Sequence, residues 1–324
     1  MRVSQEKLTA EAERTGFRPD LLEKVAMLLH LLASFQNHPF LKGKLALKGG
    51  TALNLFFLDV PRLSVDIDLN YVAQPGREEM LKDRPKMEQA LTAVFSREGF
   101  TVKRMPEDHA GGKWVLGYQS ALGQPGNLEV DLNFMFRIPL WPVSIMDSRT
   151  IGSWTANNVP VLNVHEIASG KLAALFSRHQ ARDLFDCHQI MSLDLDRVKV
   201  RAAFFVYGAM NRKDWRQIKL DNVDFDPKEL SRQLTPTLRT IAAQDAETAE
   251  EYGRRLVEET KGALGFLFPF TDAEMEFLGR LLDHGEIHPA LLTDDADLVV
   301  RLSDHPLLEW KALNVRKHKG GVPD

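Results

Sequence analysis

The chain has 324 residues, a formal net charge of −4 and a single cysteine. Its 44% apolar and 27% charged residues exclude a disordered chain, and one cysteine excludes an intrachain disulfide. The longest apolar stretch, residues 25–35, is too short to span a bilayer, which needs about 20 residues. Residues 1–15 lack the apolar core of a signal peptide, so we expect a cytoplasmic protein without a membrane partner.

The first part of the chain mixes helix and strand patterns. A helix is predicted to begin near Pro19, and a second over residues 84–98, where apolar residues recur at intervals of four. Alternating or apolar runs predict strands over 45–47, 65–69, 101–103, 113–119 and 128–136. The charged, glycine-rich residues 106–112 are a candidate mobile flap. The pattern indicates an α+β fold, with a mixed sheet and flanking helices.

Two neighbouring motifs carry the chemistry. Residues 47–53 (LKGGTAL) read as a strand end and a glycine turn that opens a helix, a place where backbone N–H groups can approach a phosphate. Residues 62–69 (RLSVDIDL) read as a strand that holds Asp66 and Asp68 on one face. Two adjacent carboxylates repel each other unless a cation lies between them, and Mg²⁺ prefers oxygen ligands. Alone, each motif is usually an ordinary turn or strand edge, but their order favours a site for a metal-bound nucleoside triphosphate.

A later alternating run also carries acidic residues. Residues 128–134 alternate between apolar and polar side chains, which places Glu129, Asp131 and Asn133 on one face. Either acid could supply a further oxygen ligand beside the first two. The alternative is a half-exposed strand whose polar side chains face water.

A lysine and an aspartate follow on predicted helical segments. Residues 164–176 form an amphipathic pattern, and a helix that continued to residue 182 would align Lys171 with Arg178 and Arg182. Asp183 comes directly after this stripe. Without further information, Lys171 and Asp183 could form an ordinary surface ion pair of little energetic value. Cys187 stands beside carboxylates that raise a thiol pKa, so we expect a buried structural cysteine rather than a nucleophile.

Beyond residue 193 the sequence is almost wholly helical in pattern. The predicted helical segments are 198–209, 226–242, 246–264 and 272–282. We therefore predict a catalytic domain over residues 1–193, with N-terminal helices, and a mainly α-helical domain over residues 194–324. Zinc-ligand spacing, a serine-hydrolase elbow and a P-loop are all missing from the sequence.

The motifs resemble those of the polymerase-β-like nucleotidyltransferase superfamily. More narrowly, residues 48–53 together with residues 62–69 are similar to the AbiEii/AbiGii-type (MenT-like) nucleotidyltransferase toxins of bacterial toxin–antitoxin systems. The spacer between Thr51 and Asp66 is longer than the general superfamily pattern and fits the narrower family. In that resemblance, Asp131 matches the third carboxylate, whereas Lys171 and Asp183 match a helix lysine and a later aspartate of the toxins.

The resemblance implies a complete set of site residues and partners. The implied catalytic residues are Asp66, Asp68, Asp131, Lys171 and Asp183, of which Asp66, Asp68 and Asp131 would bind Mg²⁺ or Mn²⁺. The implied nucleotide-binding residues are Lys48, Gly49, Gly50, Thr51, Arg62 and Ser64. The implied partners are an NTP substrate, an RNA acceptor such as the 3′ end of tRNA, and a cognate antitoxin.

Two other functions stay open at the level of sequence. The same site could transfer a nucleotide to a small molecule or to a protein hydroxyl, or the fold could serve as a catalytically silent binding module. Three acidic side chains near one another argue against the silent module. Local basic clusters permit RNA binding on this acidic protein, since phosphate contacts dominate such affinity.

Overall fold

The structure is a computed structural model that describes residues 3–105, 111–240 and 248–320. The chain forms two compact units, of which the first comprises residues 1–137, 143–162 and 232–246 and the second residues 138–142, 163–231 and 247–324. Helical residues 164–190 therefore pack with the C-terminal helices. The predicted division into domains at residue 193 stays a prediction.

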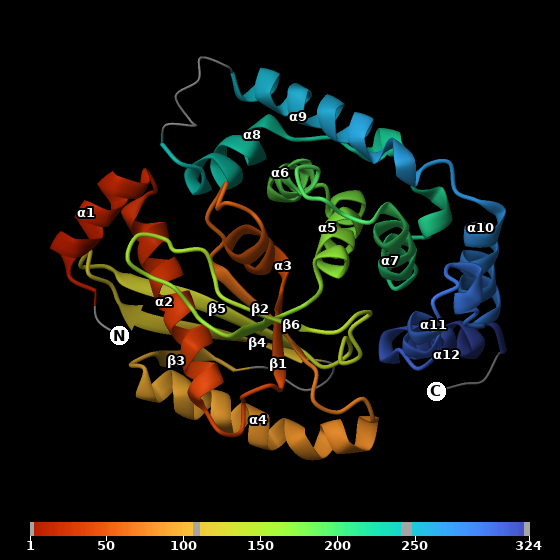
Figure 1. The fold of residues 1–324 in the computed structure, drawn as a ribbon, viewed down its shortest axis with the longest axis horizontal. Coiled ribbons are helices and arrows are strands. Elements are labelled where there is room, and N and C mark those ends of the chain that lie inside the picture. Colours follow the sequence, from red (N-terminus) through yellow and green to blue (C-terminus); the bar gives the residue numbers. More distant parts are fainter. Residues whose placement is uncertain (1–2, 106–110, 241–247, 321–324) are drawn as a thin grey trace. The chain divides into compact units, whose positions relative to one another are not determined.

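A seven-stranded mixed sheet forms the centre of the first unit (Figure 1). Its strands are β1 (Leu45–Lys48), β2 (Asp66–Tyr71), β3 (Thr101–Arg104), β4 (Gly111–Gln119), β5 (Pro125–Asn133), β6 (Ser144–Met146) and β7 (Val159–Val161). They lie in the order β3-β4-β5-β2-β1-β7-β6. The β2–β5 and β1–β7 pairs are parallel, and the other pairs are antiparallel. The predicted mixed sheet is confirmed.

Four helices accompany this sheet, namely α1 (Gln5–Thr15), α2 (Pro19–Asn37), α3 (Gly49–Ala52) and α4 (Arg77–Arg97). The apolar face of α2 is buried against α4 and β5. The α3 helix continues through a π-helical turn, Leu53–Phe57, toward β2. The α4 helix begins before the predicted residue 84, because acidic residues in its first turn favour an earlier start and Pro85 is accommodated inside it.

The predicted flap falls mainly on residues outside the described part of the chain. Residues 106–110 are among these, so the flap stays a prediction there. Gly111 and Gly112 are the first residues of β4, in register with Asn133 and Leu132 of β5. The end of the predicted loop is therefore part of the sheet.

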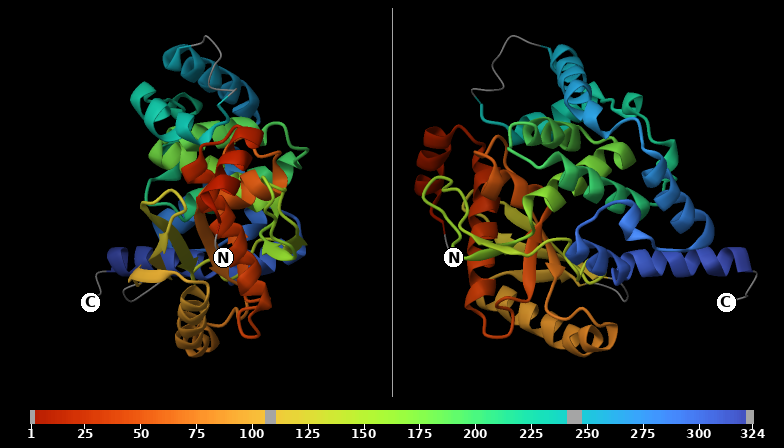
Figure 2. Two further views of the ribbon diagram at one scale, coloured as in Figure 1. Left: turned by 90° about the vertical axis from the view of Figure 1, so that its left-hand side faces the viewer. Right: turned by 45° about the vertical axis from the view of Figure 1, so that its right-hand side comes forward.

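The second unit is built from helices, as the sequence predicts. Its longer helices are α5 (Val164–Arg178), α6 (Ala181–Ile190), α7 (Arg197–Ala209), α9 (Ala249–Leu264), α10 (Asp272–Gly279), α11 (Ala296–Ser303) and α12 (Pro306–Gly320). Phe176, Phe204 and Trp215 form a buried aromatic cluster among them, with ring centroids 5.2–6.4 Å apart. The α12 helix projects beyond the other helices of this unit (Figure 2).

Two helix predictions need correction. The α5 helix ends at Arg178 because His179 takes a left-handed conformation, with φ 54°, so Arg182 belongs to α6 and not to a continuous stripe with Lys171. The helical segment predicted over residues 226–242 ends early in its described part, residues 226–240. There α8 (Pro227–Glu229) continues through a π-helical turn, Leu230–Leu234, and a 3₁₀ turn, Thr235–Thr237, and Pro236 cannot donate a helical hydrogen bond.

The end of this segment packs in the first unit through its backbone. Leu63 N–H donates to Thr237 O at 2.9 Å, and Thr240 N–H donates to Gly16 O at 2.7 Å. Across the described residues, no helix is both long and apolar enough to cross a membrane.

Candidate functional site

Four charged residues lie in one row across the central strands. The strand registers pair Lys48 of β1 with Asp68 of β2, Asp68 with Asp131 of β5, and Asp131 with Lys113 of β4. Directly paired residues of adjacent strands carry their side chains on the same face of a sheet. The row is therefore positive, negative, negative, positive, with two carboxylates at its centre.

The alternating sequence explains why these strands expose their acids. Along β2 and β5, the apolar residues Ile67, Leu69, Val130 and Leu132 are almost fully buried. The intervening acidic side chains are only partly buried. Asp66 pairs with Glu129 in the next row of the same face. The structure thus brings all four acids together on one half-exposed surface, in two adjacent pairs.

The two candidates for the third carboxylate differ in their contacts. The ammonium of Lys113 lies 2.7 Å from Glu129 Oε2. Its hydrogen bond to Glu129 raises the pKa of Lys113, and the charges of Asp131 and Asp66 raise it further, against an opposing effect of burial. The Asp68 and Asp131 carboxylates form no hydrogen bond or ion pair with any residue that the structure describes. These contacts favour Asp131 as the carboxylate available to a ligand.

The glycine turn packs directly against the Asp68 carboxylate. Gly49 has a φ of 73°, a left-handed conformation that favours glycine, and a Cβ at this position would collide with Asp68 Oδ2. The Thr51 hydroxyl donates to Asp66 O at 2.5 Å. The Asn54 side-chain amide donates to Gly50 O at 2.9 Å and ties the first helical turn together. The turn and the carboxylate strand are thus one structural element.

The residues that precede the acids are buried. Arg62 is 2% exposed and donates from Nη1 to Leu63 O at 3.0 Å, and Ser64 is 8% exposed. Lys48 Nζ lies 5.3 Å from the centroid of the Phe136 ring. Nucleotide binding by Arg62, Ser64 and Lys48 stays a prediction.

The donor set fits a magnesium ion that a nucleotide brings with it. In the described part of the chain, no group of three or more histidine, cysteine, aspartate or glutamate side chains is already assembled to hold a metal ion. Mg²⁺, however, commonly takes only one or two protein carboxylates and completes its ligands with water and substrate phosphates. Asp66 and Asp68, two residues apart on one face, supply oxygens of the required kind.

A network of four charges, of which Lys171, Asp183 and Asp186 are buried and Arg178 is exposed, lies in the second unit. Lys171 Nζ is 2.7 Å from Asp186 Oδ2 and 3.3 Å from Asp183 Oδ1. Arg178 contacts both Asp183 oxygens, at 2.5 and 2.9 Å. The Asp183 and Asp186 side chains are 1% and 0% exposed. Lys171 and Asp183 are therefore brought together, in a buried network rather than in a surface ion pair.

The network sets the protonation of its members. Burial acts to raise the pKa of Asp183, but the hydrogen bond from Arg178 and the charge of Lys171 outweigh it and hold that pKa below its usual value. Burial, with the charges of Asp183 and Asp186, raises the pKa of the Cys187 thiol. Cys187 is fully buried, as predicted for a structural cysteine.

Sequence reasoning did not identify two residues of these clusters. Lys113 emerges only from the pairing of β4 with β5, which no local pattern reveals. Asp186 had a local signal, because it stands three residues after Asp183 and such residues share one face of a helix.

We predict that Asp183→Asn destabilises the second unit by about 3 kcal/mol at neutral pH, since it removes one carboxylate from a buried ion pair. The folded pKa lies below the unfolded value of 3.8, so the carboxylate stabilises the fold fully above that value. The contribution is lost as the pH falls through the folded pKa. Urea denaturation from pH 7 to pH 3 measures both effects.

The matched control is Asp194→Asn, which changes an exposed aspartate of the same unit. Its free energy of unfolding should stay within about 0.5 kcal/mol of wild type. Equal stability of the Asp183 variant and the wild type at pH 7 would show that the network contributes nothing.

Comparisons with known proteins place this fold and these motifs in a family. Residues 30–262 match the family described as nucleotidyl transferase AbiEii toxin, type IV toxin–antitoxin system. A similar solved structure is MenT4, a nucleotidyltransferase toxin from Mycobacterium tuberculosis H37Rv, with a TM-score of 0.60 and 17% sequence identity over 93% of this chain and 99% of that chain. No curated protein sequence matches the chain. The predicted resemblance and fold are confirmed: the chain belongs to the AbiEii family of nucleotidyltransferase toxins of type IV toxin–antitoxin systems.

Proposed function

We propose that the protein transfers a nucleotide from an NTP to an RNA acceptor, at the 3′ end of tRNA, with Mg²⁺ or Mn²⁺ bound. The observation that carries the proposal is the pairing of Asp68 with Asp131 beside Asp66, on a half-exposed face against the Gly49 turn. Membership of the AbiEii family supports nucleotidyl transfer as the reaction and implies an antitoxin partner. The metal, the acceptor and the cytoplasmic location are our inferences.

The proposed reaction forms one bond and breaks one. The oxygen of an acceptor hydroxyl attacks the α-phosphorus of the NTP, the bond from that phosphorus to the bridging oxygen breaks, and pyrophosphate leaves with the electron pair. Asp66 and Asp68, with Asp131, would hold the cation, which supplies neutralising charge for the triphosphate when bound. Asp131 is suited to accept the hydroxyl proton, because no described residue competes for its oxygens.

The residues around the acids would bind the rest of the nucleotide. Backbone N–H groups of Gly50 and Thr51, in the first turn of α3, would contact the β- and γ-phosphates. Lys48 and Lys113 flank the acids in the same row, so their charges would limit repulsion between the carboxylates and the triphosphate. We propose Lys171 as a further countercharge and Asp183 as the residue that positions its ammonium.

Replacing both aspartates tests the proposed reaction. We predict that Asp66→Asn/Asp68→Asn abolishes incorporation of labelled NTP into bulk tRNA, because the amides no longer neutralise a cation, while the melting temperature changes little. The measurement is transfer of label to tRNA with each NTP in turn and Mg²⁺ present. Wild-type label on a small molecule or on protein, and none on RNA, would overturn the acceptor assignment.

Gly49 offers a test of the contact between the turn and Asp68. We predict that Gly49→Ala lowers the transfer rate by at least about tenfold, because the new methyl group displaces the Asp68 carboxylate. The matched control is Gly43→Ala, which has nearly the same φ, 74°, but meets no atom within 4 Å. Both variants carry the same backbone strain, of about 1–2 kcal/mol. Equal rates for the two variants would contradict the role given to this contact.

Asp131 and Glu129 can be told apart in the same assay. We predict that Asp131→Asn lowers the transfer rate by about 10²–10⁴-fold, the range typical for loss of a proton acceptor. Glu129→Gln should retain most activity, because Glu129 is engaged with Lys113. The reverse order of the two rates would assign the role to Glu129.

A further inference from the structure

A pocket of about 560 Å³ in the second unit combines an aromatic face with basic side chains. Its lining residues are Arg212, Leu282, Trp310, Lys311, Asn314, Val315 and His318. Five of them lie on α12, Arg212 follows α7, and Leu282 lies in the turn after α10. The volume falls in the range of ordinary small-ligand pockets.

Trp310 differs from every other tryptophan of the chain. Its side chain is 53% exposed at the pocket, whereas Trp114, Trp141, Trp154 and Trp215 are at most 7% exposed. An exposed indole next to a hollow offers a flat surface on which another aromatic ring can stack. Leu282 and Val315 add apolar surface beside it.

The ionisable side chains that line the pocket are all basic. Arg212 and His318 are exposed and form no ion pair with any residue that the structure describes. Lys311 donates to Asn211 O at 2.7 Å, and the charge of Asp214, which does not line the pocket, also acts on its ammonium group. Among the described residues that line the pocket there is no carboxylate. The pocket therefore favours an anion next to an aromatic ring.

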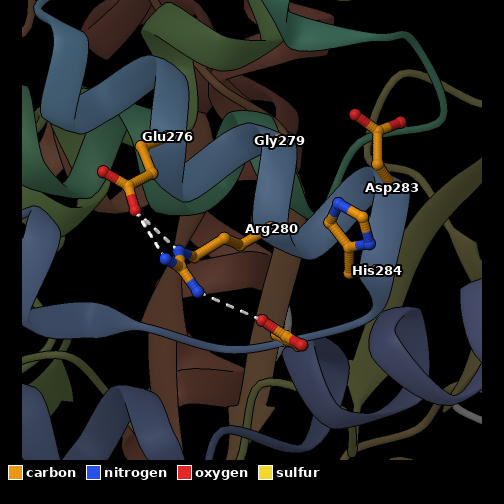
Figure 3. A pocket seen from close by; sticks show the side chains of 6 residues that line it. Glu276, Gly279, Arg280, Asp283 and His284 are labelled. Carbon is orange, nitrogen blue, oxygen red and sulfur yellow. Dashed lines mark hydrogen bonds and ion pairs between the residues drawn. The ribbon is translucent and has the colours of Figure 1, made fainter.

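A second pocket in the same unit is lined by an arginine that is already paired with carboxylates (Figure 3). It has a volume of about 460 Å³, and the guanidinium of Arg280 lies between two carboxylates that line it. Arg280 is 2.7 Å from Glu276 and 3.3 Å from Glu286. Its positive charge is already neutralised, so this pocket does not suit an anion.

We propose that the Trp310 pocket binds one nucleotide of a single-stranded RNA, with its base stacked on the indole. Arg212, Lys311 and His318 would contact the adjoining phosphates, and the Asn314 amide can hydrogen-bond an edge of the base. Stacking on aromatic side chains together with backbone contacts from basic groups is how proteins hold unpaired nucleotides. The inference rests on the proposed function only in that it treats this RNA as the acceptor.

Binding of a labelled oligouridylate to the full chain, without NTP, tests the proposal. Trp310→Ala should weaken binding by at least about tenfold, whereas Trp310→Phe, which keeps an aromatic ring, should restore most of it. Arg212→Ala should weaken binding and lower the slope of log affinity against log salt by about one. The matched control is Arg316→Ala, an exposed cation of α12 outside the pocket, which should bind nearly as well as wild type.

The fluorescence of Trp310 gives an independent readout. Because the other tryptophans are buried, acrylamide should quench mainly Trp310, and oligouridylate should protect it. The same quenching experiment with UMP or UTP in place of oligouridylate tests whether a free nucleotide binds the pocket. Protection by UTP but not by RNA would overturn the assignment to an RNA strand.

Equal RNA affinity of the wild type and Trp310→Ala would also overturn the proposal. If the oligomeric state of Trp310→Ala then differed from that of the wild type, the pocket would be a protein interface. The Asp66→Asn/Asp68→Asn variant should bind oligouridylate like wild type, so failure of the reaction and failure of the pocket are separate results.

Discussion

The repulsion between neighbouring carboxylates is the constraint on which the site depends. The register of β2 against β5 places Asp68 beside Asp131 and Asp66 beside Glu129, on one face of the sheet. Like charges directly opposite each other destabilise a sheet, so the proximity of these acids carries an electrostatic cost. Lys113 offsets part of the repulsion through Glu129. We propose that a bound cation offsets the rest, which would link the fold of the first unit to metal-dependent chemistry.

In the second unit, the acidic side chains at Lys171 are paired with cations. Asp183 and Asp186 are buried, and each contacts Lys171, with Arg178 completing a network of two anions and two cations. Such a network fixes the position of an ammonium group between two buried carboxylates, and the exposed Arg178 guanidinium balances the second negative charge. At the Trp310 pocket the cations have no carboxylate among the lining residues. The cations at Lys171 are paired with carboxylates and stabilise the fold, whereas those at the Trp310 pocket are suited to an anionic ligand.

The sequence predicted the parts of the site that depend on local periodicity. Alternation along β2 and β5 revealed which acids share a face, and the glycine pair marked the turn next to them. Contacts set by distant packing were not predictable, such as Lys113 opposite Asp131 and the Gly49 backbone against Asp68. The helix expected over residues 226–242 ends at Thr237, because the backbone groups of Thr237 and Thr240 form hydrogen bonds with Leu63 and Gly16 instead of helical ones. The roles given to Lys171, Asp183, Arg62 and Ser64 stay predictions.

The most direct measurement is the binding of Mn²⁺ to the protein with a non-hydrolysable NTP analogue, followed by electron paramagnetic resonance. The account predicts that the wild type binds Mn²⁺ and the analogue together, and that Asp66→Asn/Asp68→Asn loses this binding while it remains folded. Unchanged Mn²⁺ binding in the double variant would contradict the account, because the carboxylates of β2 would then not be the metal ligands.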